Sequence, residues 1–195
     1  MTKAWQEAPG MRLPQGGFTI IELVVTIVVL AVLTGIGIPS LREFLVRSQL
    51  SSAAGEIHAA VARTRQESIT RGTFVTITPL TGTDWATGYQ IFVNPRNRAT
   101  YTPTDSVGAG TSIVSAEILT VRDAPNWSYI TWPANTSDGN PHRDYFTFDD
   151  TGRPRNFDGT VMTPASPSRV RMCISGGACR ELLVDNLGRI QILKN

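Results

Sequence analysis

The feature that most constrains this chain is an apolar run from Phe18 to Ile38, built almost entirely of Phe, Ile, Leu, Val, Ala, Thr and Gly. Coiled into a helix, such a run reaches about 31 Å, close to the thickness of the hydrocarbon core of a bilayer. It carries a single charge, Glu22, near its start. We therefore predict that residues 18–38 form a transmembrane helix.

The carboxylate of Glu22 needs a partner in that environment. A charged group at the centre of a membrane helix costs about 2.5–3.5 kcal/mol on insertion scales, and less near a helix end. No Lys or Arg lies within a turn or two of Glu22. The partner is therefore expected from another subunit, or from a positive charge created by cutting the chain. The alternative is an ordinary single-span anchor with a chance Glu.

The residues from Gly17 to Leu23 read Gly-Phe-Thr-Ile-Ile-Glu-Leu, which resembles the processing site of type IV pilins and type II secretion pseudopilins. In that family a prepilin peptidase cuts after the glycine and N-methylates the new first residue. The resemblance implies cleavage between Gly17 and Phe18, methylation of Phe18, and an assembly role for Glu22 opposite the amine of a neighbouring subunit. Pro39 stands where many of these pilins carry a proline, which implies a helix kink.

Residues 1–17 would then be a cytoplasmic leader that cleavage removes. Lys3 and Arg12 outnumber Glu7, and a net positive segment stays on the cytoplasmic side. The segment lacks the separate apolar region and small-residue cleavage site of an ordinary secretory signal. Met11 is an alternative start, which leaves a short leader that still carries Arg12.

Residues 39–72 are predicted to continue the helix in amphipathic form. Its apolar stripe comprises the side chains Leu41, Phe44, Leu45, Ala53, Ala54, Ile57, Ala60, Val61 and Ile69. Gly72 is suited to end the helix in a left-handed conformation. A heptad coiled coil is disfavoured because the stripe is short and rich in Ala and Ser.

Residues 73–195 are predicted to form an antiparallel β-rich domain. Short runs rich in β-branched and aromatic residues alternate with Gly, Pro, Asn, Asp and Ser clusters. The expected strands are Phe74–Ile77, Tyr89–Val93, Ile118–Val121, Tyr129–Trp132, Tyr145–Phe148, Arg169–Ile174, Glu181–Val184 and Arg189–Leu193. Residues 100–115 and 136–143 are predicted loops. One helix followed by many strands gives an α+β fold.

Two internal segments resemble parts of the GspH/FimT-type minor pilins. Residues Ala62–Ile77 resemble the junction between the helix and the first strand, and residues Gly88–Arg98 resemble a strand-turn motif. Asn94 stands in place of that motif's Asp, and Arg98 in place of an Asn. The resemblance implies a type IV pilin-like fold. In that fold a long N-terminal helix, its first half transmembrane, packs on a C-terminal antiparallel β-sheet domain located in the periplasm.

The two cysteines, Cys173 and Cys179, lie close together in sequence. An even pair outside the cytoplasm indicates a disulfide. A zinc site needs four ligands, and His58 and His142 lie far away in sequence. We therefore predict a disulfide, with no metal and no cofactor.

No enzyme motif stands out in the sequence. His142 with Asp144, and Asp149 with Asp150, are the clustered titratable groups. The first pair lies in a loop-like stretch, and the second begins a hairpin-turn sequence. With two histidines in the chain there is little material for acid–base chemistry. The sequence predicts a protein that is not an enzyme.

Nucleic-acid binding is a more specific hypothesis than enzyme activity. Some FimT-like minor pilins bind DNA through a Gly-Arg-x-Arg motif in a C-terminal loop. Here Gly152-Arg153-Pro154-Arg155 matches that motif but lies before the C-terminal loop. The C-terminal candidate, Gly188-Arg189, lacks the second Arg. Arg153, Arg155 and Arg189 are the candidate DNA contacts. The alternative is a surface of mixed charge, because acidic residues lie among these arginines.

The sequence predicts a minor pilin that is processed by prepilin peptidase and assembled with other pilin or pseudopilin subunits into a type IV pilus. It would first be a single-pass protein among the lipids of the inner membrane, with its C-terminal domain in the periplasm. The alternatives are a minor pseudopilin of type II secretion and a membrane-tethered periplasmic binding domain unrelated to filaments.

Overall fold

The computed structural model describes residues 17–108, 113–124, 127, 129–133, 145–163, 167–175 and 177–194. Its internal contacts divide the chain into two units between Arg42 and Glu43. We call them the N-terminal unit and the C-terminal domain. Helix α1 (Ile20–Arg71) runs through most of the described part of the first unit and is the opening element of the second.

In the N-terminal unit, α1 is apolar on all sides. Every residue whose burial is described between Gly17 and Arg42 is exposed. The most apolar 18-residue window of α1 has a mean hydropathy of 2.6, so the helix is long and apolar enough to cross a membrane. The helix begins at Ile20, two residues after the predicted start at Phe18. It continues through Pro39, where the predicted kink stays a prediction.

In the C-terminal domain, one face of α1 is buried. That face comprises Leu50, Ala53, Ala54, Ile57, Ala60, Val61, Thr64 and Ser68. The predicted stripe is wrong at its ends, because Leu41, Phe44, Leu45 and Ile69 are exposed. Thr64 and Ser68 continue the buried face instead. Their hydroxyls donate to the carbonyls of Ala60 and Arg65, so neither polar group is left unpaired.

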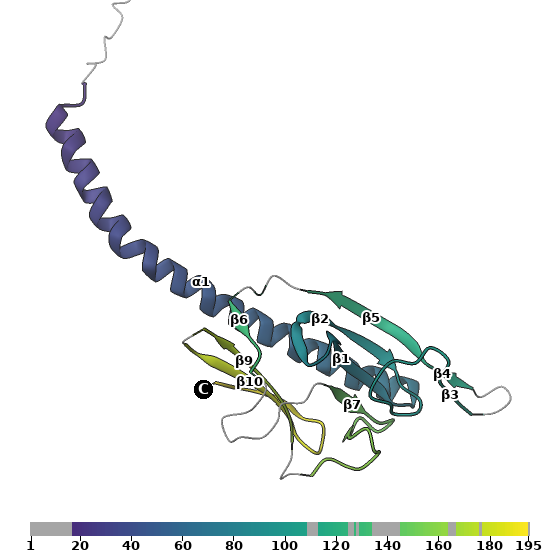
Figure 1. Cartoon of the computed structure of the whole chain (residues 1–195). Coiled ribbons are helices and arrows are strands. Elements are labelled where there is room, and N and C mark those ends of the chain that lie inside the picture. The colour runs from purple at the N-terminus through teal and green to yellow at the C-terminus, as the bar shows by residue number, and fades with distance from the viewer. Residues whose placement is uncertain are drawn as a thin grey trace, which may run out of the picture. The chain divides into compact units, whose positions relative to one another are not determined.

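The larger sheet has five strands in the order β5-β2-β1-β7-β8, all antiparallel to their neighbours. Figure 1 shows β1 and β2 beside the C-terminal half of α1. The strands are β1 (Val75–Thr81), β2 (Asp84–Val93), β5 (Glu117–Asp123), β7 (Phe146–Phe148) and β8 (Pro154–Arg155). Two ion pairs, Arg71–Glu117 and Arg122–Glu56, tie the edge strand β5 to the helix.

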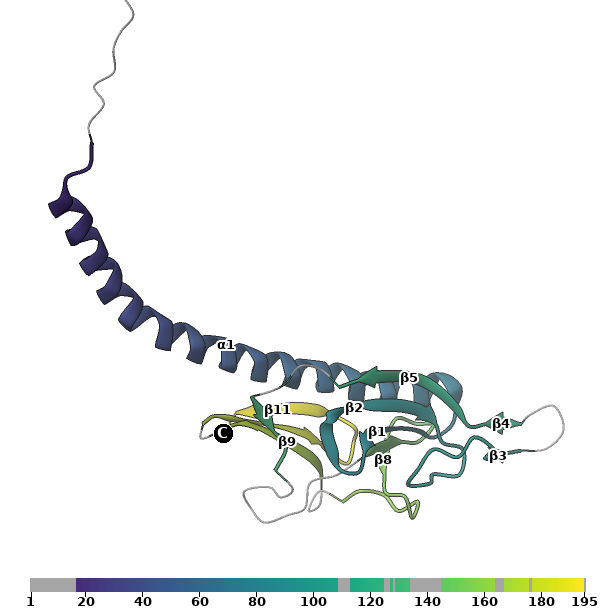
Figure 2. The same ribbon diagram turned by 45° about the horizontal axis from the view of Figure 1, so that its top comes forward.

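A second antiparallel sheet has the order β11-β10-β9-β6, visible in part in Figure 2. Its strands are β6 (Ile130–Thr131), β9 (Ser168–Ile174), β10 (Cys179–Val184) and β11 (Ile190–Lys194). Cys173 and Cys179 lie directly opposite each other in β9 and β10 and form the predicted disulfide. A small sheet pairs β3 (Ser106–Val107) with β4 (Val114–Ser115).

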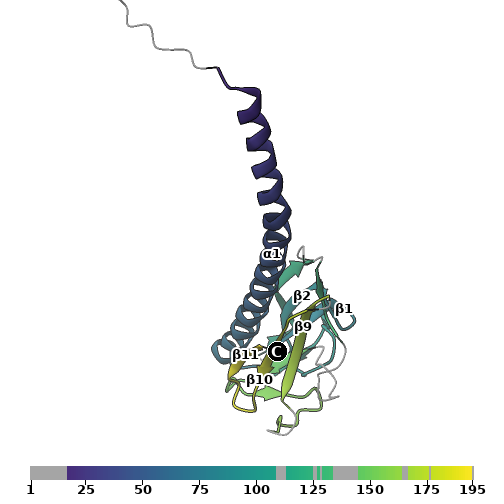
Figure 3. The ribbon, with the colours of Figure 1, turned by 90° about the vertical axis from the view of Figure 1, so that its left-hand side faces the viewer.

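The helix and both sheets share one hydrophobic core. The helix contributes Ile57 and Val61, the five-stranded sheet contributes Ile77, Ile91, Phe146 and Phe148, and the second sheet contributes Val170, Met172, Leu182 and Val184. Figure 3 shows α1 running alongside the strands in this domain. Among the described strands, none of the first sheet pairs with one of the second, and the helix packs against both sheets.

The predicted α+β fold and the eight predicted strands are confirmed, although most boundaries shift by a few residues. Gly72 ends the helix with φ of 61°, as predicted. The prediction of a loop over residues 100–115 is wrong in part, because β3 and β4 pair there. The prediction also missed β8, whose Pro154 argues against a strand. Residues 136–143 lie outside the described residues.

Asn94 shows why an amide suits the position after β2. Its Nδ2 donates to the hydroxyl of Thr76 at 2.8 Å and to the carbonyl of Arg98 at 2.9 Å. Its Oδ1 accepts from the amide of Arg98 at 2.8 Å. A carboxylate could accept but not donate these bonds. The amide therefore closes the turn and ties it to the buried hydroxyl of β1.

Ile57 offers a direct test of the core. Ile57→Ala should lower the free energy of unfolding by about 2–5 kcal/mol, because it leaves a cavity where the helix meets the sheets. The measurement is urea unfolding of a fragment spanning Glu43–Asn195. Ile118→Ala is the matched control, since Ile118 is 42% exposed on edge strand β5. It should cost less than about 1 kcal/mol. Equal losses for both variants would contradict this assignment of the core.

Candidate functional site

The predicted cleavage site lies just before the start of α1. Gly17, Phe18 and Thr19 are non-helical and exposed, and Phe18 is 84% exposed. Thr19 is the N-cap of α1. Its Oγ1 accepts a hydrogen bond from the amide of Glu22 at 3.2 Å. Glu22 Oε2 in turn accepts from the amide of Thr19 at 3.5 Å. This reciprocal arrangement is a capping box, which satisfies two amides of the first turn.

Among the described residues, Glu22 forms no ion pair. The hydrogen-bond partner of its carboxylate is the backbone amide of Thr19, just before the helix. The side chains around it are apolar and exposed, including Ile21, Leu23 and Val25. The structure therefore places a carboxylate at the end of an apolar helix that this chain does not cover. The expected cationic partner is not supplied by the described part of the chain.

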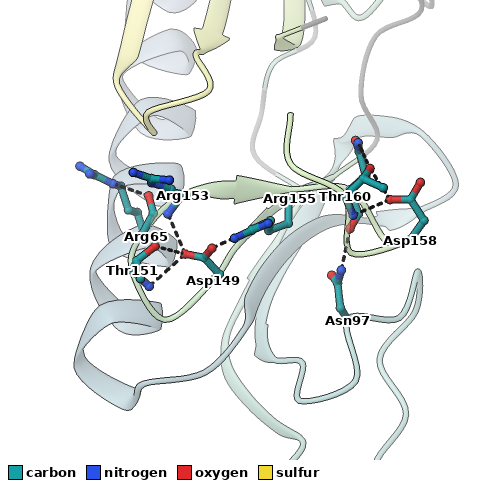
Figure 4. Close-up of polar contacts among 10 residues, drawn as sticks. Arg65, Asn97, Asp149, Thr151, Arg153, Arg155, Asp158 and Thr160 are labelled. Carbon is teal, nitrogen blue, oxygen red and sulfur yellow. Dashed lines mark hydrogen bonds and ion pairs between the residues drawn. The ribbon is translucent and has the colours of Figure 1, made fainter. Parts of the chain in front are cut away.

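A second polar site lies on the C-terminal domain, in the turn between β7 and β8. The carbonyl of Asp149 accepts from the amide of Gly152, and the amide of Asp149 donates to the carbonyl of Arg153. Asp149 Oδ1 also accepts from the amides of Thr151 and Arg153, each at 2.9 Å. Figure 4 shows this carboxylate between Thr151 and Arg155. The aspartate therefore holds the whole turn together.

The turn between β10 and β11 repeats this pattern. The amide of Gly188 donates to the carbonyl of Asp185, and the amide of Asp185 donates to the carbonyl of Arg189. Asp185 Oδ1 accepts from the amides of Leu187 and Arg189, each at 2.9 Å. Both turns read Asp-x-x-Gly-Arg, and both glycines have positive φ, 75° for Gly152 and 78° for Gly188. One local sequence thus produces the same turn in two different sheets.

The fold brings these two turns into contact. A Cβ built on Gly188 would lie 2.5 Å from the carbonyl oxygen of Gly152. Arg65 of α1 lies at the same point, and its Nε donates to that oxygen at 2.9 Å. The two halves of the split Gly-Arg pattern are therefore neighbours in space. Sequence reasoning missed Arg65 and Asp185, although the repeat of Asp-x-x-Gly-Arg was the available signal.

The three candidate DNA contacts differ in what holds them. Arg155 Nε lies 2.7 Å from Asp149 Oδ2 and is partly buried. Arg189 Nε lies 2.6 Å from Asp185 Oδ2. Arg153 is exposed, and in the part of the chain that the structure describes its side chain forms no ion pair. Two of the three guanidinium groups are therefore already neutralised within the chain.

The same contacts shift the acidity of both aspartates. Burial alone would raise the pKa of Asp149, but hydrogen bonds from Thr151, Arg153 and Arg155 outweigh burial and lower it below its usual value. Burial likewise opposes hydrogen bonds from Arg189 and Leu187, which lower the pKa of Asp185. Both carboxylates are therefore held in the charged form.

The remaining titratable residues singled out in the sequence are His142, Asp144 and Asp150. His142 and Asp144 lie outside the described residues. Asp150 is exposed beside Asp149. Among the residues that the structure describes, no group of three or more His, Cys, Asp and Glu side chains is placed to hold a metal ion.

The pKa direction at Asp149 gives a testable pH dependence. A carboxyl whose folded pKa is depressed stabilises the fold above its unfolded pKa, about 4, and this contribution is lost as the pH falls through the folded value. Asp149→Asn should therefore lower the free energy of unfolding at pH 7 by about 1–3 kcal/mol. It should also reduce the loss of stability of the domain below about pH 4.

Urea unfolding between pH 2 and pH 7 measures both effects. The adjacent exposed Asp150 supplies the control, because Asp150→Asn removes a charge without removing the turn contacts. If the two variants behave alike at every pH, Asp149 does not hold the turn as described.

Comparison with known proteins identifies the chain. Residues 53–188 match the family described as type II transport protein GspH, and residues 12–38 match the prokaryotic N-terminal methylation motif. The chain is 29% identical over 178 residues to the pilin-like protein PilA1 of Thermus thermophilus. That match covers 90% of this chain and 97% of the relative.

A similar fold is found in the crystal structure of the type IV minor pilin FimU of Pseudomonas aeruginosa. The TM-score is 0.51 at 22% sequence identity, covering 77% of this chain and 92% of that one. The GspH match spans most of the domain that carries the paired turns, and the methylation motif spans the capped apolar start of α1. The chain therefore belongs to the GspH family and is a minor pilin or pseudopilin.

Proposed function

We propose that the chain is a minor subunit of a type IV pilus, cut by prepilin peptidase between Gly17 and Phe18 and N-methylated at Phe18. The observation that carries this proposal is an exposed apolar helix that begins two residues after Phe18, with Glu22 in its first turn. The family consists of structural subunits rather than enzymes, and the proposed role is likewise assembly into a filament.

The physical argument concerns the fate of the apolar segment. Ile, Val and Leu side chains exposed all round a helix need lipid or other helices as their surroundings. The proposed sequence is insertion into the inner membrane first, then transfer into the core of a filament with other pilin subunits. Glu22 would offset the amine that cleavage creates on an adjacent subunit. An unpaired charge in either apolar environment would be costly.

In the proposed topology, the C-terminal domain would lie in the periplasm. The positive leader favours a cytoplasmic N-terminus, and one span then carries the domain to the other side. The Cys173–Cys179 disulfide supports this assignment, because such bonds persist in oxidising compartments.

The type II secretion pseudopilus is the alternative machine. The family description favours secretion, whereas the relative PilA1 is called pilin-like, which favours the pilus. A deletion strain distinguishes the two: loss of surface pili with normal protein secretion supports the pilus, and the reverse result supports secretion. A tethered binding domain unrelated to filaments would affect neither.

Substitution of Glu22 tests the assembly role. Glu22→Ala should lower incorporation into filaments several-fold, because the amine on the neighbouring subunit would lose its counter-charge. Insertion into the membrane should be unchanged, since the apolar run is kept. Incorporation is measured as the ratio of subunit in sheared filaments to subunit in the membrane fraction.

Glu43→Ala is the matched control, because Glu43 is an exposed carboxylate of the same helix that pairs with Arg47. It should leave incorporation unchanged. Incorporation of Glu22→Ala at the parental level would refute the pairing role of Glu22.

DNA binding is a second candidate function, favoured by the contact between the two Gly-Arg turns. Arg65, Arg153 and Arg189 come from three separate segments, and Gly152 and Gly188 bring those segments together. Against this, Asp149 and Asp185 pair with two of the neighbouring arginines. We therefore expect non-specific binding that depends mainly on Arg153 and falls steeply with salt.

The test is a salt titration of the processed protein against random double-stranded DNA. Arg153→Ala should weaken binding at low salt several-fold and reduce the salt dependence by about one phosphate contact. Arg63→Ala is the control, because it removes an exposed arginine from α1. An affinity that is undetectable at low salt, or equal for the two variants, would end this candidate.

A further inference from the structure

The five-stranded sheet carries a cleft whose described lining residues belong to neither candidate site. Its volume is about 420 Å³, within the range of about 300–1,000 Å³ that is typical of small-molecule sites. Thr78 of β1 and Gln90 of β2 line it from the sheet, and Tyr145 and Phe157 line it from the segments around β7 and β8. Ile77 points into the shared core, so its neighbour Thr78 faces the side of the sheet away from α1.

Two polar side chains in this cleft have no hydrogen-bond partner in the described part of the chain. Thr78 and Gln90 are directly opposite each other in the β1–β2 ladder, so their side chains share one face. Thr78 is only 8% exposed, yet its hydroxyl stays unpaired. In the adjacent row the hydroxyls of Thr76 and Thr147 bond to each other at 2.6 Å. Buried polar groups are ordinarily paired, so the row of Thr78 is open to a group from outside.

An aromatic surface stands beside these polar groups. The rings of Tyr145 and Phe157 stack with their centres 3.5 Å apart. The hydroxyl of Tyr145 accepts a hydrogen bond from the amide of Phe157 at 3.3 Å, which fixes the pair. Phe157 is partly exposed where it lines the cleft. A flat apolar ring next to a hydroxyl and an amide can contact both the C–H and the polar groups of one ligand.

The loop after β2 closes another side of the cleft and is held in place by polar contacts. It contributes Thr100 to the lining. Asn97, which has a positive φ of 52°, donates from Nδ2 to the carbonyl of Asn156 at 2.6 Å (Figure 4). The next residue, Arg98, places Nε 2.6 Å from a carboxylate oxygen of Asp105. The cleft is therefore largely formed before a ligand arrives, which reduces the entropic cost of binding.

The chemistry of the lining restricts what can bind. Among the described lining residues none carries a charge, so an ion would lose its hydration without gaining a counter-charge. An apolar ligand would leave Thr78 and Gln90 unpaired. An extended peptide adds to an open strand edge, whereas β1 is paired on both sides, with β2 and β7. A neutral sugar supplies hydroxyl groups that both donate and accept, together with an apolar C–H face.

We propose that this cleft binds a neutral saccharide, with a pyranose ring against Phe157 and sugar hydroxyls bonded to Thr78 and Gln90. Two sources share this chemistry, the N-acetylated glycan of a cell wall and a polysaccharide without acetylated amines. The proposal adds a ligand to the assembly role. It does not depend on which filament the chain joins.

The test is saturation-transfer NMR of the full-length chain with two disaccharides. Chitobiose represents N-acetylated glycans, and cellobiose represents glycans without the acetyl group. The protein is kept in a polyoxyethylene detergent, because detergents with sugar headgroups would compete for the cleft. At least one disaccharide should bind with a Kd of about 1 mM or tighter. The disaccharide that binds more tightly identifies the source.

Substitutions in the cleft locate the binding. Thr78→Val and Gln90→Leu should each weaken it roughly fivefold, the effect of one lost neutral hydrogen bond. Phe157→Leu should weaken it by a similar factor, because the flat ring surface is lost. Thr120→Val is the matched control, since Thr120 lies on β5 opposite Ile91 and does not line the cleft. It should keep the parental affinity.

Urea unfolding of the same variants separates binding from support of the fold. Thr78→Val should keep or raise the unfolding midpoint, because its hydroxyl has no hydrogen bond to lose. Thr147→Val should lower the midpoint, because it breaks the buried bond to Thr76. If Thr78→Val loses stability together with affinity, Thr78 supports the fold and is not a ligand contact.

Three further results would overturn the proposal. If neither disaccharide gives a signal at about 10 mM, the cleft is not a saccharide site. If Thr78→Val, Gln90→Leu and Phe157→Leu all bind like the parent, the sugar binds elsewhere. If the uncharged peptide N-acetyl-trialanine amide binds in place of both sugars, and Thr78→Val weakens its binding, the cleft takes a peptide.

Discussion

The structure depends on one long helix, α1, whose two parts require different surroundings. Before Ile38 apolar side chains lie on every side of the helix, with Glu22 as its one charge, and the chain covers none of the described ones. From Leu50 onwards the helix is amphipathic, and two sheets bury its inner face. The hydrophobic effect therefore acts twice along α1. It favours apolar surroundings from outside the chain for the first part and a folded domain for the second.

Much of the fold was predictable because local sequence and tertiary role agree. Runs such as Arg169–Ile174 combine β-branched residues with flanking turn residues, and they form strands in the structure. The length of the buried helical face was not predictable from hydrophobicity alone. Phe44 is exposed while Thr64 is fully buried, because coverage depends on where the sheets lie and a threonine can satisfy its hydroxyl on its own helix.

The two candidate sites also differ in how far the sequence alone predicts them. Residues at the start of α1 are close in sequence, so the pattern from Gly17 to Glu22 predicts a processing site without a structure, and a methylation-motif family matches there. The paired turns are formed by residues 36 positions apart, Gly152 and Gly188, together with Arg65 from the helix. Only the packing of two sheets on one helix brings them together. Sequence reasoning therefore named Arg153, Arg155 and Arg189 and predicted the hairpin turn that begins at Asp149. It did not predict the contact of Arg65 or the pairing of the two aspartates with Arg155 and Arg189.

The contact between Gly188 and Gly152 also limits how this surface can evolve. A side chain at position 188 would collide with a backbone oxygen, which cannot move aside as a flexible side chain can. Saturation mutagenesis should therefore find this hairpin tip as intolerant as an interior position, while exposed Leu187 beside it accepts many residues. One backbone atom therefore fixes glycine at this hairpin tip, and sequence variation is left to the flanking side chains.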